Sequence, residues 1–378
     1  MDFTGGFLNL FQFNSMSKKN TVVIVILLLT TLMICCRPDD PAVEPEDPQD
    51  PQVSVDLDKV PYAQLSDYHF FVDDIRNQQP NSGVLPYKPI SALFSDYASK
   101  KRFVWMPEGK KASYNGDGKV LEFPEGAVLI KTFYYDHVQP DNTSRLIETR
   151  VMIRKDNKWI FAEYVWNEDQ TDAHLDMAGS YTDINWQKES GELIPIHYRI
   201  PSETECFTCH KSNEQPIPIG PKPQNLNNPY PFEEGTKNQL QRWIEVGYLE
   251  DNLPQNIVST IDYYDATQPL DLRIRSYVDI NCAHCHQEGS HCDYRPLRLA
   301  FSETGNPDNL GVCVPPDENI GSQLKYIILP QRPERSVMYY RLMSTDENVR
   351  MPLLGRSVVH EEGVALLEEW INTLEPCN

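Results

Sequence analysis

Between residues 56 and 200, short runs of alternating or continuous apolar residues are separated by Gly, Pro, Asp and Asn. Alternation with a period of two is typical of β-strands, and turn residues between such runs favour antiparallel neighbours. The turns at 115–118 and 140–143 have this character. The pattern therefore predicts a β-rich domain over 56–200, folded as an antiparallel β-sandwich or a jelly-roll-like fold. The expected strands cover 120–135, 145–154, 158–166, 180–186 and 193–200.

After residue 201 the strand pattern fades and a helical period appears. Ser202 and Glu205 form a capping-box pattern, which predicts a short helix at the residues that follow. A second helix is expected over 239–249, and apolar residues near 272–278 predict a third that ends before Cys282.

An apolar stripe at helical spacing closes the chain and ends before Pro376, which predicts an amphipathic helix there. The whole chain is therefore expected to be α+β and multidomain, with the β-rich domain followed by two mainly α-helical segments. These segments are 201–270 and 271–378. The stripe consists of Val364, Leu367, Trp370, Ile371 and Leu374.

The N-terminal 36 residues have the pattern of an export signal, with Lys18 and Lys19 before an apolar run that looks too short to span a bilayer. The run ends at Cys35 and Cys36, and its last residues resemble a bacterial lipoprotein cleavage site. Cys36 is the preferred lipidated residue and Cys35 the alternative, which would attach the chain to a membrane. An uncleaved or conventionally cleaved signal with incidental cysteines is the other interpretation.

Residues 37–55 are rich in proline and acidic residues and nearly lack apolar ones, which predicts an extended linker. The complete chain has 34 Lys+Arg against 55 Asp+Glu, a formal charge of −21. This charge disfavours nucleic acid as a partner and favours basic or neutral protein partners. We therefore expect a periplasmic or cell-surface bacterial lipoprotein that contacts other proteins.

Two CxxCH motifs carry the clearest chemistry in the sequence. A c-type haem forms thioether bonds to two cysteines about one helical turn apart, and the following His reaches the iron. With 9 Cys and 9 His in 378 residues, chance would produce such a motif only about 0.005 times per chain. The sequence therefore predicts two haem c groups. The attachment and proximal residues are Cys206, Cys209 and His210 in one motif, and Cys282, Cys285 and His286 in the other.

Zinc and disulfides are the structural alternatives for these cysteine pairs. Cys209 and Cys282 are 73 positions apart, whereas pairs in a zinc ribbon are usually about 15 to 20 residues apart. A disulfide pair does not require a histidine after each second cysteine. Both alternatives are therefore weaker than haem.

The sixth ligand decides whether a haem transfers electrons or binds a further ligand. For the second haem, Met351 is the expected ligand because Pro352 biases it toward an extended loop that precedes the closing helix. Met343 is the fallback, and a core-filling role for Met351 is the structural alternative.

For the first haem the alternatives stay open. The β-rich domain could supply His174, Met177 or His197, the later segment could supply His291, His360 or a spare Met, or the position could be open. His284, inside the second motif, is poorly placed for its own iron and is expected to be a packing residue. Each of the histidines of the β-rich domain, taken singly, is more often a surface or core residue than a ligand.

Three cysteines remain in the C-terminal part of the chain. Cys292 and Cys313 could form a disulfide in an oxidising compartment. Cys377 would then be unpaired, or would replace one of the two.

Most of the chain from 60 to 375 resembles a family of exported di-haem c-type cytochromes with a β-rich N-terminal domain, and the C-terminal part resembles small cytochrome c domains with His/Met ligands. The resemblance implies haem attachment at both motifs and Met351 as the axial ligand of the second. Cys313 falls inside one of the stretches that carry it. The stretches are 93–97, 101–107, 123–135, 164–171, 219–227, 310–316 and 351–363.

The expected function is electron transfer through two covalent haems to redox partner proteins. A peroxidase-like enzyme with an open first haem is an alternative from a different class. A third possibility is an accessory or binding subunit, in which the β-rich domain docks a partner while the haems serve a larger complex.

Overall fold

The structure, a computed structural model, describes residues 51–318 and 320–377. The predicted export signal with Cys35 and Cys36, and most of the predicted linker, lie outside the described residues. The described residues belong to one compact unit. No helix among them is long and apolar enough to cross a lipid bilayer.

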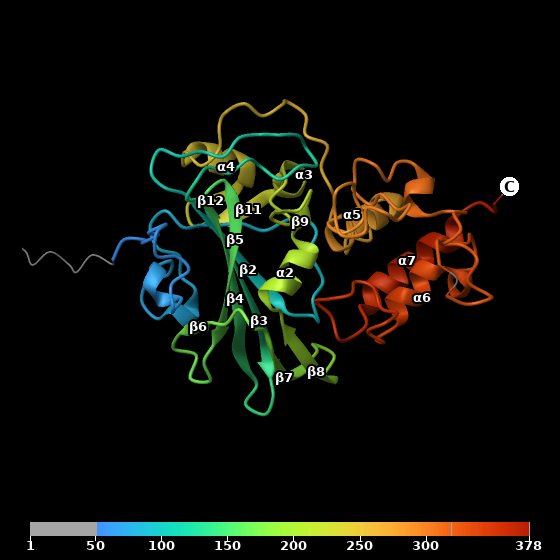
Figure 1. Cartoon of the computed structure of the whole chain (residues 1–378), viewed down its shortest axis with the longest axis horizontal. Coiled ribbons are helices and arrows are strands. Elements are labelled where there is room, and N and C mark those ends of the chain that lie inside the picture. Colours follow the sequence, from blue (N-terminus) through green and yellow to red (C-terminus); the bar gives the residue numbers. More distant parts are fainter. Residues whose placement is uncertain (1–50, 319, 378) are drawn as a thin grey trace, which may run out of the picture. The chain divides into compact units, whose positions relative to one another are not determined.

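An antiparallel sheet of eight strands forms the centre of this unit (Figure 1). Its order is β1-β2-β3-β4-β5-β6, and the β7–β8 hairpin joins through a pairing of β7 with the end of β3. The prediction of an antiparallel, β-rich part of the chain is confirmed. The strands are β1 (Leu85–Pro86), β2 (Ser99–Trp105), β3 (Val128–Val138), β4 (Thr143–Lys155), β5 (Lys158–Trp166), β6 (Ala173–Leu175), β7 (Ser180–Gln187) and β8 (Leu193–Ile200).

The strands differ from the prediction in two ways. They form one hydrogen-bonded sheet rather than the two facing sheets of a β-sandwich, because segments outside the sheet cover both of its faces. Strand β2 was not predicted, since its first four residues, Ser-Lys-Lys-Arg, hide the alternation of the strand.

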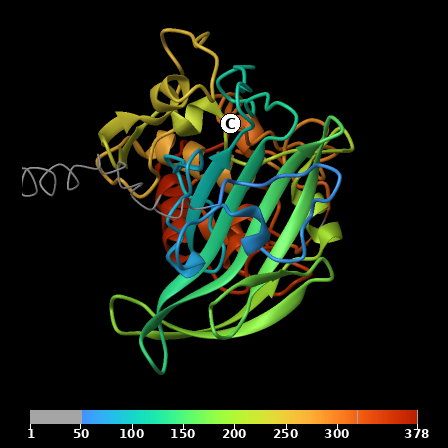
Figure 2. The same cartoon turned by 90° about the vertical axis from the view of Figure 1, so that its left-hand side faces the viewer.

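The outer face of the sheet is packed against the N-terminal part of the described chain. Tyr68 and Phe70 from this part are almost completely buried against Ile130 and Tyr164 of the sheet. Figure 2 shows the same segment, in blue, crossing the front of the twisted sheet, with the red C-terminal helices behind it. Residues 53 and 55, which the sequence placed in the linker, also pack against this core, so the folded part begins earlier than the predicted 56.

The inner face of the sheet packs against the segment that follows β8. Leu226 and Trp243 of this segment are fully buried with Leu129 and Phe161 of the sheet. The inner face of the sheet and the first predicted haem segment therefore share one core, whereas the core on the outer face is formed by residues before 200 alone.

This segment is not mainly α-helical, so that part of the prediction was wrong. It contains three short helices, α2 (Glu203–Cys209), α3 (Pro223–Leu226) and α4 (Gln239–Glu245). Prolines explain the short elements, because each lacks a backbone N–H and restricts the residue before it. They occur at 201, 216, 218, 221, 223, 229 and 231. Two small hairpins join the helices: β9 (Lys211–Ser212) with β10 (Gln215–Pro216), and β11 (Pro229–Phe232) with β12 (Gly235–Asn238).

The C-terminal segment has a core of its own, formed around Leu299, Ile328, Leu367 and Trp370. The predicted helix before Cys282 and the predicted closing helix are both confirmed, and the apolar stripe of the latter faces this core. The helices are α5 (Leu270–Asn281), α6 (Val337–Met343) and α7 (Glu361–Thr373). Single 3-10 turns lie at Ser66–Tyr68, Ile75–Asn77, Pro307–Leu310 and Pro333–Arg335.

A disulfide joins Cys313 to Cys377, with the two Cα atoms 5.8 Å apart. The suggested Cys292–Cys313 pair is therefore wrong, and Cys377 takes the place of Cys292. The physical reason is tertiary: α7 packs against α5 and returns the C-terminal residues to the turn at Cys313. Cys292 is buried and free.

Candidate functional site: two cysteine-lined cavities

Helix α2 positions the first CxxCH motif. Ser202 accepts a hydrogen bond from the backbone N–H of Glu205, and the Glu205 carboxylate accepts one from the backbone N–H of Ser202, which completes the predicted capping box. Arg199 of β8 donates to the same carboxylate over 2.6 Å and anchors the helix to the sheet. Cys206 and Cys209 consequently lie about one helical turn apart, as thioether attachment requires.

His210 follows this helix and is oriented by one of its ring nitrogens. Its Nδ1 lies 2.9 Å from the carbonyl oxygen of Ile217, to which a protonated Nδ1 donates. Such a bond leaves Nε2 as the free nitrogen for a metal. Burial lowers the pKa of His210 to about 3, so the imidazole is neutral at physiological pH and able to bind a metal. Its ring stands edge-on to Phe161 of the sheet.

Together with its two cysteines, His210 lines a first cavity with about 1290 Å³ of empty space on the inner face of the sheet. This space includes solvent at the mouth of the cavity, and all three residues of one complete motif border it.

A turn at the end of α5 positions the second motif. The backbone N–H groups of Cys285 and His286 both donate to the carbonyl oxygen of Cys282, over 3.0 Å in each case. Burial lowers the pKa of His286 to about 4, and its Nδ1 is buried without a hydrogen-bond partner among the described residues. All three residues line a second cavity with about 1220 Å³ of empty space.

Met351 and Met338 line this second cavity together with His286. Met343, the fallback ligand, does not line it and its side chain is 47% exposed. Of the two methionines named from the sequence, only Met351 is therefore available to a group held by His286.

The loop that carries Met351 is held by a buried arginine and a buried aspartate. The Arg356 guanidinium donates to the carbonyl oxygens of Met351 and Ser344, at 3.1 and 2.8 Å. Asp96, from the segment before β2, accepts a 2.6 Å hydrogen bond from the backbone N–H of Ser357. Because Arg356 is only 4% exposed and Asp96 only 2% exposed, water competes little for these bonds.

None of the named candidates for the sixth ligand of the first haem lines the first cavity. The imidazole of His197 pairs with Asp183 on the surface, and that of His360 bonds Tyr264 and Tyr277 in the C-terminal segment. The remaining candidates, His174, Met177 and His291, are also absent from its walls. Three other residues of the cavity wall, Lys131, Met152 and His284, carry a nitrogen or sulfur atom of the kind that binds a metal.

A cluster of charged residues on the inner face of the sheet was missed in the sequence. The Arg150 guanidinium forms ion pairs with Glu148 and, over 3.2 Å, with Glu163. The hydroxyl of Tyr198 donates to Glu148 over 2.6 Å. The signal that could have revealed the cluster is the presence of these charges at the buried positions of otherwise apolar strands.

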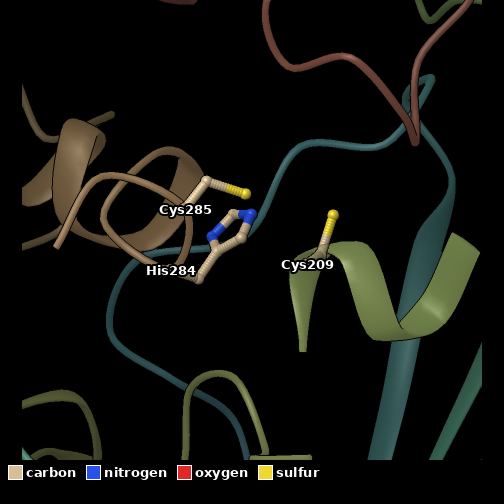
Figure 3. A group of neighbouring side chains, drawn as sticks. All are labelled: Cys209, His284 and Cys285. Atoms are coloured by element: carbon tan, nitrogen blue, oxygen red, sulfur yellow. The ribbon is translucent and has the colours of Figure 1, made fainter. Parts of the chain in front are cut away.

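The two cavities meet at His284. One ring nitrogen of His284 and the sulfur atoms of Cys209 and Cys285 lie within 4.8 Å of one another. Figure 3 shows Cys209 at the end of α2 facing the side chains of His284 and Cys285 from the turn after α5. Cys209, His284, Asn281 and Pro352 each line both cavities. The prediction that His284 is only a packing residue is therefore incomplete, since it separates the two sites.

Haem and zinc make different demands on these residues. Zinc sites in proteins usually have four ligands, and the described residues place only three candidate ligands together here. In the chain without haem, a hydrogen bond with Cys285, supported by His284, holds the pKa of the Cys209 thiol well below its usual value. Two large cavities, each lined by one complete CxxCH motif, fit haem better than a single ion.

Comparison with known proteins adds no further information, because no family model, curated protein or solved structure is found that matches this chain.

Proposed function

We propose that this protein is a c-type cytochrome that carries two covalently attached haems and transfers electrons between protein partners. The two segments after residue 200, 201–270 and 271–378, would then be cytochrome c-type segments, as the sequence resemblance implies. The residues that would hold the haems are Cys206, Cys209 and His210 in the first cavity, and Cys282, Cys285, His286 and Met351 in the second.

One observation carries the proposal: each motif lines its own cavity, and the second motif shares its cavity with Met351. An imidazole and a thioether as the two axial ligands are typical of electron-transfer haems. When bound, the haems supply one-electron redox chemistry.

The chain's own residues exclude water and fix the ligands. Leu297, Leu299 and Leu367 form apolar walls of the second cavity, and Arg356 fixes the backbone of Met351 by a hydrogen bond to its carbonyl oxygen. When water is excluded and the ligands are held in place, the ligands and their surroundings rearrange less as the charge of the metal changes.

The contact between Cys209 and Cys285 supports a two-centre path for electrons. Their sulfur atoms, which would each form a thioether, lie within 4.8 Å of each other. The two redox groups would therefore be neighbours within one compact unit. Electrons that enter at the second site could reach the first without a second protein.

Export and membrane attachment through Cys36, or through Cys35, are part of the same proposal and are supported by the sequence of residues 18–36. The charge of −21 favours basic or neutral redox partners. Nucleic acid is disfavoured for the same reason.

A peroxidase-like enzyme remains the second candidate, favoured by one feature of the first cavity. Its walls include the charged residues Lys131, Arg150 and Glu163, and none of the ligand candidates named from the sequence. An open iron position beside polar groups is suited to ligand binding or catalysis rather than to electron transfer alone.

The covalent haem content of the purified full chain tests the proposal. We expect the pyridine haemochrome assay to give two haems per chain for the wild type, one for Cys206→Ala/Cys209→Ala, and one for Cys282→Ala/Cys285→Ala. Cys292→Ser, which alters a free cysteine outside both motifs but on the wall of the second cavity, is the matched control for the loss of a thiol and should keep both haems. The proposal would be refuted if the wild-type chain, produced in cells that attach c-type haem to other proteins, contained zinc in place of haem.

A further inference from the structure

A row of charged side chains crosses four strands on the inner face of the sheet. In the strand register, Arg102 of β2 is opposite Lys131 of β3, Lys131 is opposite Arg150 of β4, and Arg150 is opposite Glu163 of β5. Three neighbouring positions of this row are therefore basic residues, and burial, followed by the charge of Arg102, holds the pKa of Lys131 well below its usual value. Like charges at directly opposed positions of a sheet are destabilising.

Only one of these three cations has acidic partners. Arg150 pairs with Glu148 and Glu163, whereas Arg102 and Lys131 have no ion pair with any residue among 51–318 and 320–377. The amino group of Lys131 makes a cation–π contact with Phe133, with Nζ 4.6 Å from the centroid of the ring. A fourth cation, Lys100, flanks the same ring at 5.8 Å.

Lys131 and Arg150 line the first cavity, in which His210 also lies. Glu163 lines it too and is 2% exposed, and its carboxyl group lies 3.2 Å from the Nε of Arg150 without a well-aligned hydrogen bond. A buried polar group without a partner, like a buried cation without a counter-ion, is costly. The wall of the cavity thus presents the amino group of Lys131, which has no acidic partner among the described residues, beside the Arg150–Glu163 pair.

We propose that the first cavity is an anion-binding site, in which Lys131, supported by Arg150 and Arg102, binds a small inorganic anion at the haem held by His210. The chemical class is that of anions that coordinate ferric iron, such as nitrite and azide. This inference rests on the proposed function and deepens it, because it makes the first haem a ligand-binding centre and the second an electron carrier.

The carboxylates of the haem itself are the other source of negative charge for the same cations. Cys206 and Cys209, the attachment residues, are both within electrostatic range of Arg150. Haem carboxylates lie on the edge of the porphyrin opposite the thioethers. Because Arg150 interacts electrostatically with both attachment residues, it lies toward the thioether edge, which is the less suitable one for the haem carboxylates and favours a free anion.

Titration of the haem-loaded, ferric full chain with azide and nitrite, followed in the Soret band, tests the proposal. For the wild type we expect saturable binding at one of the two haems. Lys131→Gln should weaken azide and nitrite binding by about tenfold or more, because a charge-assisted contact is lost. Imidazole, a neutral ligand, should bind both proteins equally.

Lys101→Gln is the matched control. Lys101 is on β2, one residue from Arg102, but its side chain is on the outer face, where it donates to the carbonyl oxygen of Asn77 over 3.1 Å. This variant should bind azide like the wild type. Because Lys131 has no acidic partner to leave unpaired, Lys131→Gln should remain folded, which a urea titration verifies.

Two results would overturn the anion site. One is a wild-type first haem that binds neither azide nor nitrite, and the other is equal azide affinity in Lys131→Gln and the wild type. If that equal affinity is accompanied by a changed reduction potential of the first haem, the basic residues are assigned to the haem carboxylates. Failure of the proposed function is distinguishable, because the pyridine haemochrome assay on the same samples would then find no haem on Cys206 and Cys209.

Discussion

The Cys313–Cys377 disulfide fastens the end of the chain, just beyond α7, to a turn of the C-terminal core. We expect Cys377→Ser to lower the free energy of unfolding strongly while leaving the positions of both haem motifs unchanged. The reason is that a cross-link mainly restricts the unfolded chain, and neither cysteine lines a cavity.

The expected magnitude follows from the length of the closed loop. The two cysteines are 64 positions apart in the sequence, and the loop-entropy relation for such a length gives about 4 kcal/mol at 25 °C. Since a folded unit is usually stable by about 5–15 kcal/mol, this loss would remove a large fraction of the total.

Urea unfolding followed by circular dichroism, without reductant, measures the effect. Cys292→Ser is the matched control: it changes a buried free cysteine of the same segment and should cost about 1 kcal/mol. A thiol titration of the denatured Cys377→Ser variant should find one more thiol than in the wild type, that of Cys313. A large loss in Cys292→Ser with little effect in Cys377→Ser would show that the pairing is wrong.

Three further predictions concern the two cavities. Met351→Ala should keep both haems attached but lower the reduction potential of the second, since a thioether ligand raises it; a potentiometric titration identical to that of the wild type would exclude Met351 as the ligand. Arg356→Gln should reduce the free energy of unfolding by about 2–4 kcal/mol, because the carbonyl oxygens of Met351 and Ser344 lose a charged hydrogen-bond donor. If Met351 is the ligand, the same variant should weaken the methionine-to-iron absorption band. An unchanged urea midpoint would contradict this role of Arg356. Burial, followed by the nearby Glu148 carboxylate and opposed by the Arg150 guanidinium, raises the pKa of Glu163 well above its usual value. The folded chain therefore keeps a proton on Glu163 that the unfolded chain releases above about pH 4.3. This contribution to stability is complete below that pH and is lost as the pH rises through the folded-state pKa of Glu163. The urea midpoints of Glu163→Gln should lack this fall with pH, and parallel curves of midpoint against pH for the variant and the wild type would refute the raised pKa.

Local signals in the sequence predicted the local structure. The capping box at Ser202 and Glu205 needs only four consecutive residues, and the structure forms it as expected. The stripe that ends with Ile371 and Leu374 depends on helical spacing alone, and α7 buries it. Both succeed because the interactions that determine them lie within one turn or one face of a helix.

Features that depend on tertiary packing were not predictable in this way. The disulfide partner of Cys313 depends on where α7 returns the C-terminus, and three cysteines at 292, 313 and 377 offer no local reason to choose. The first haem segment seemed independent because its motif is complete, yet it packs on the sheet through residues such as Trp243. Spacing within a motif contains no information about the surface on which the motif packs.

The charged row explains why the two sites should behave differently. Lys131 and Arg150 are 19 positions apart in the sequence, and only the register of β3 with β4 places them side by side. The second cavity, in contrast, is lined mostly by the C-terminal segment, including α5, α6 and the loop of Met351, with Thr208 and Cys209 of α2 at its edge. A sheet that merely supported a haem would need no unpaired cations on its inner face, because apolar side chains would pack there at lower cost. Lys131 at this position therefore supports the proposal that the sheet contributes chemistry to the first site, whereas the mainly apolar walls of the second cavity and the Arg356 hydrogen bonds support the proposal of an electron carrier there.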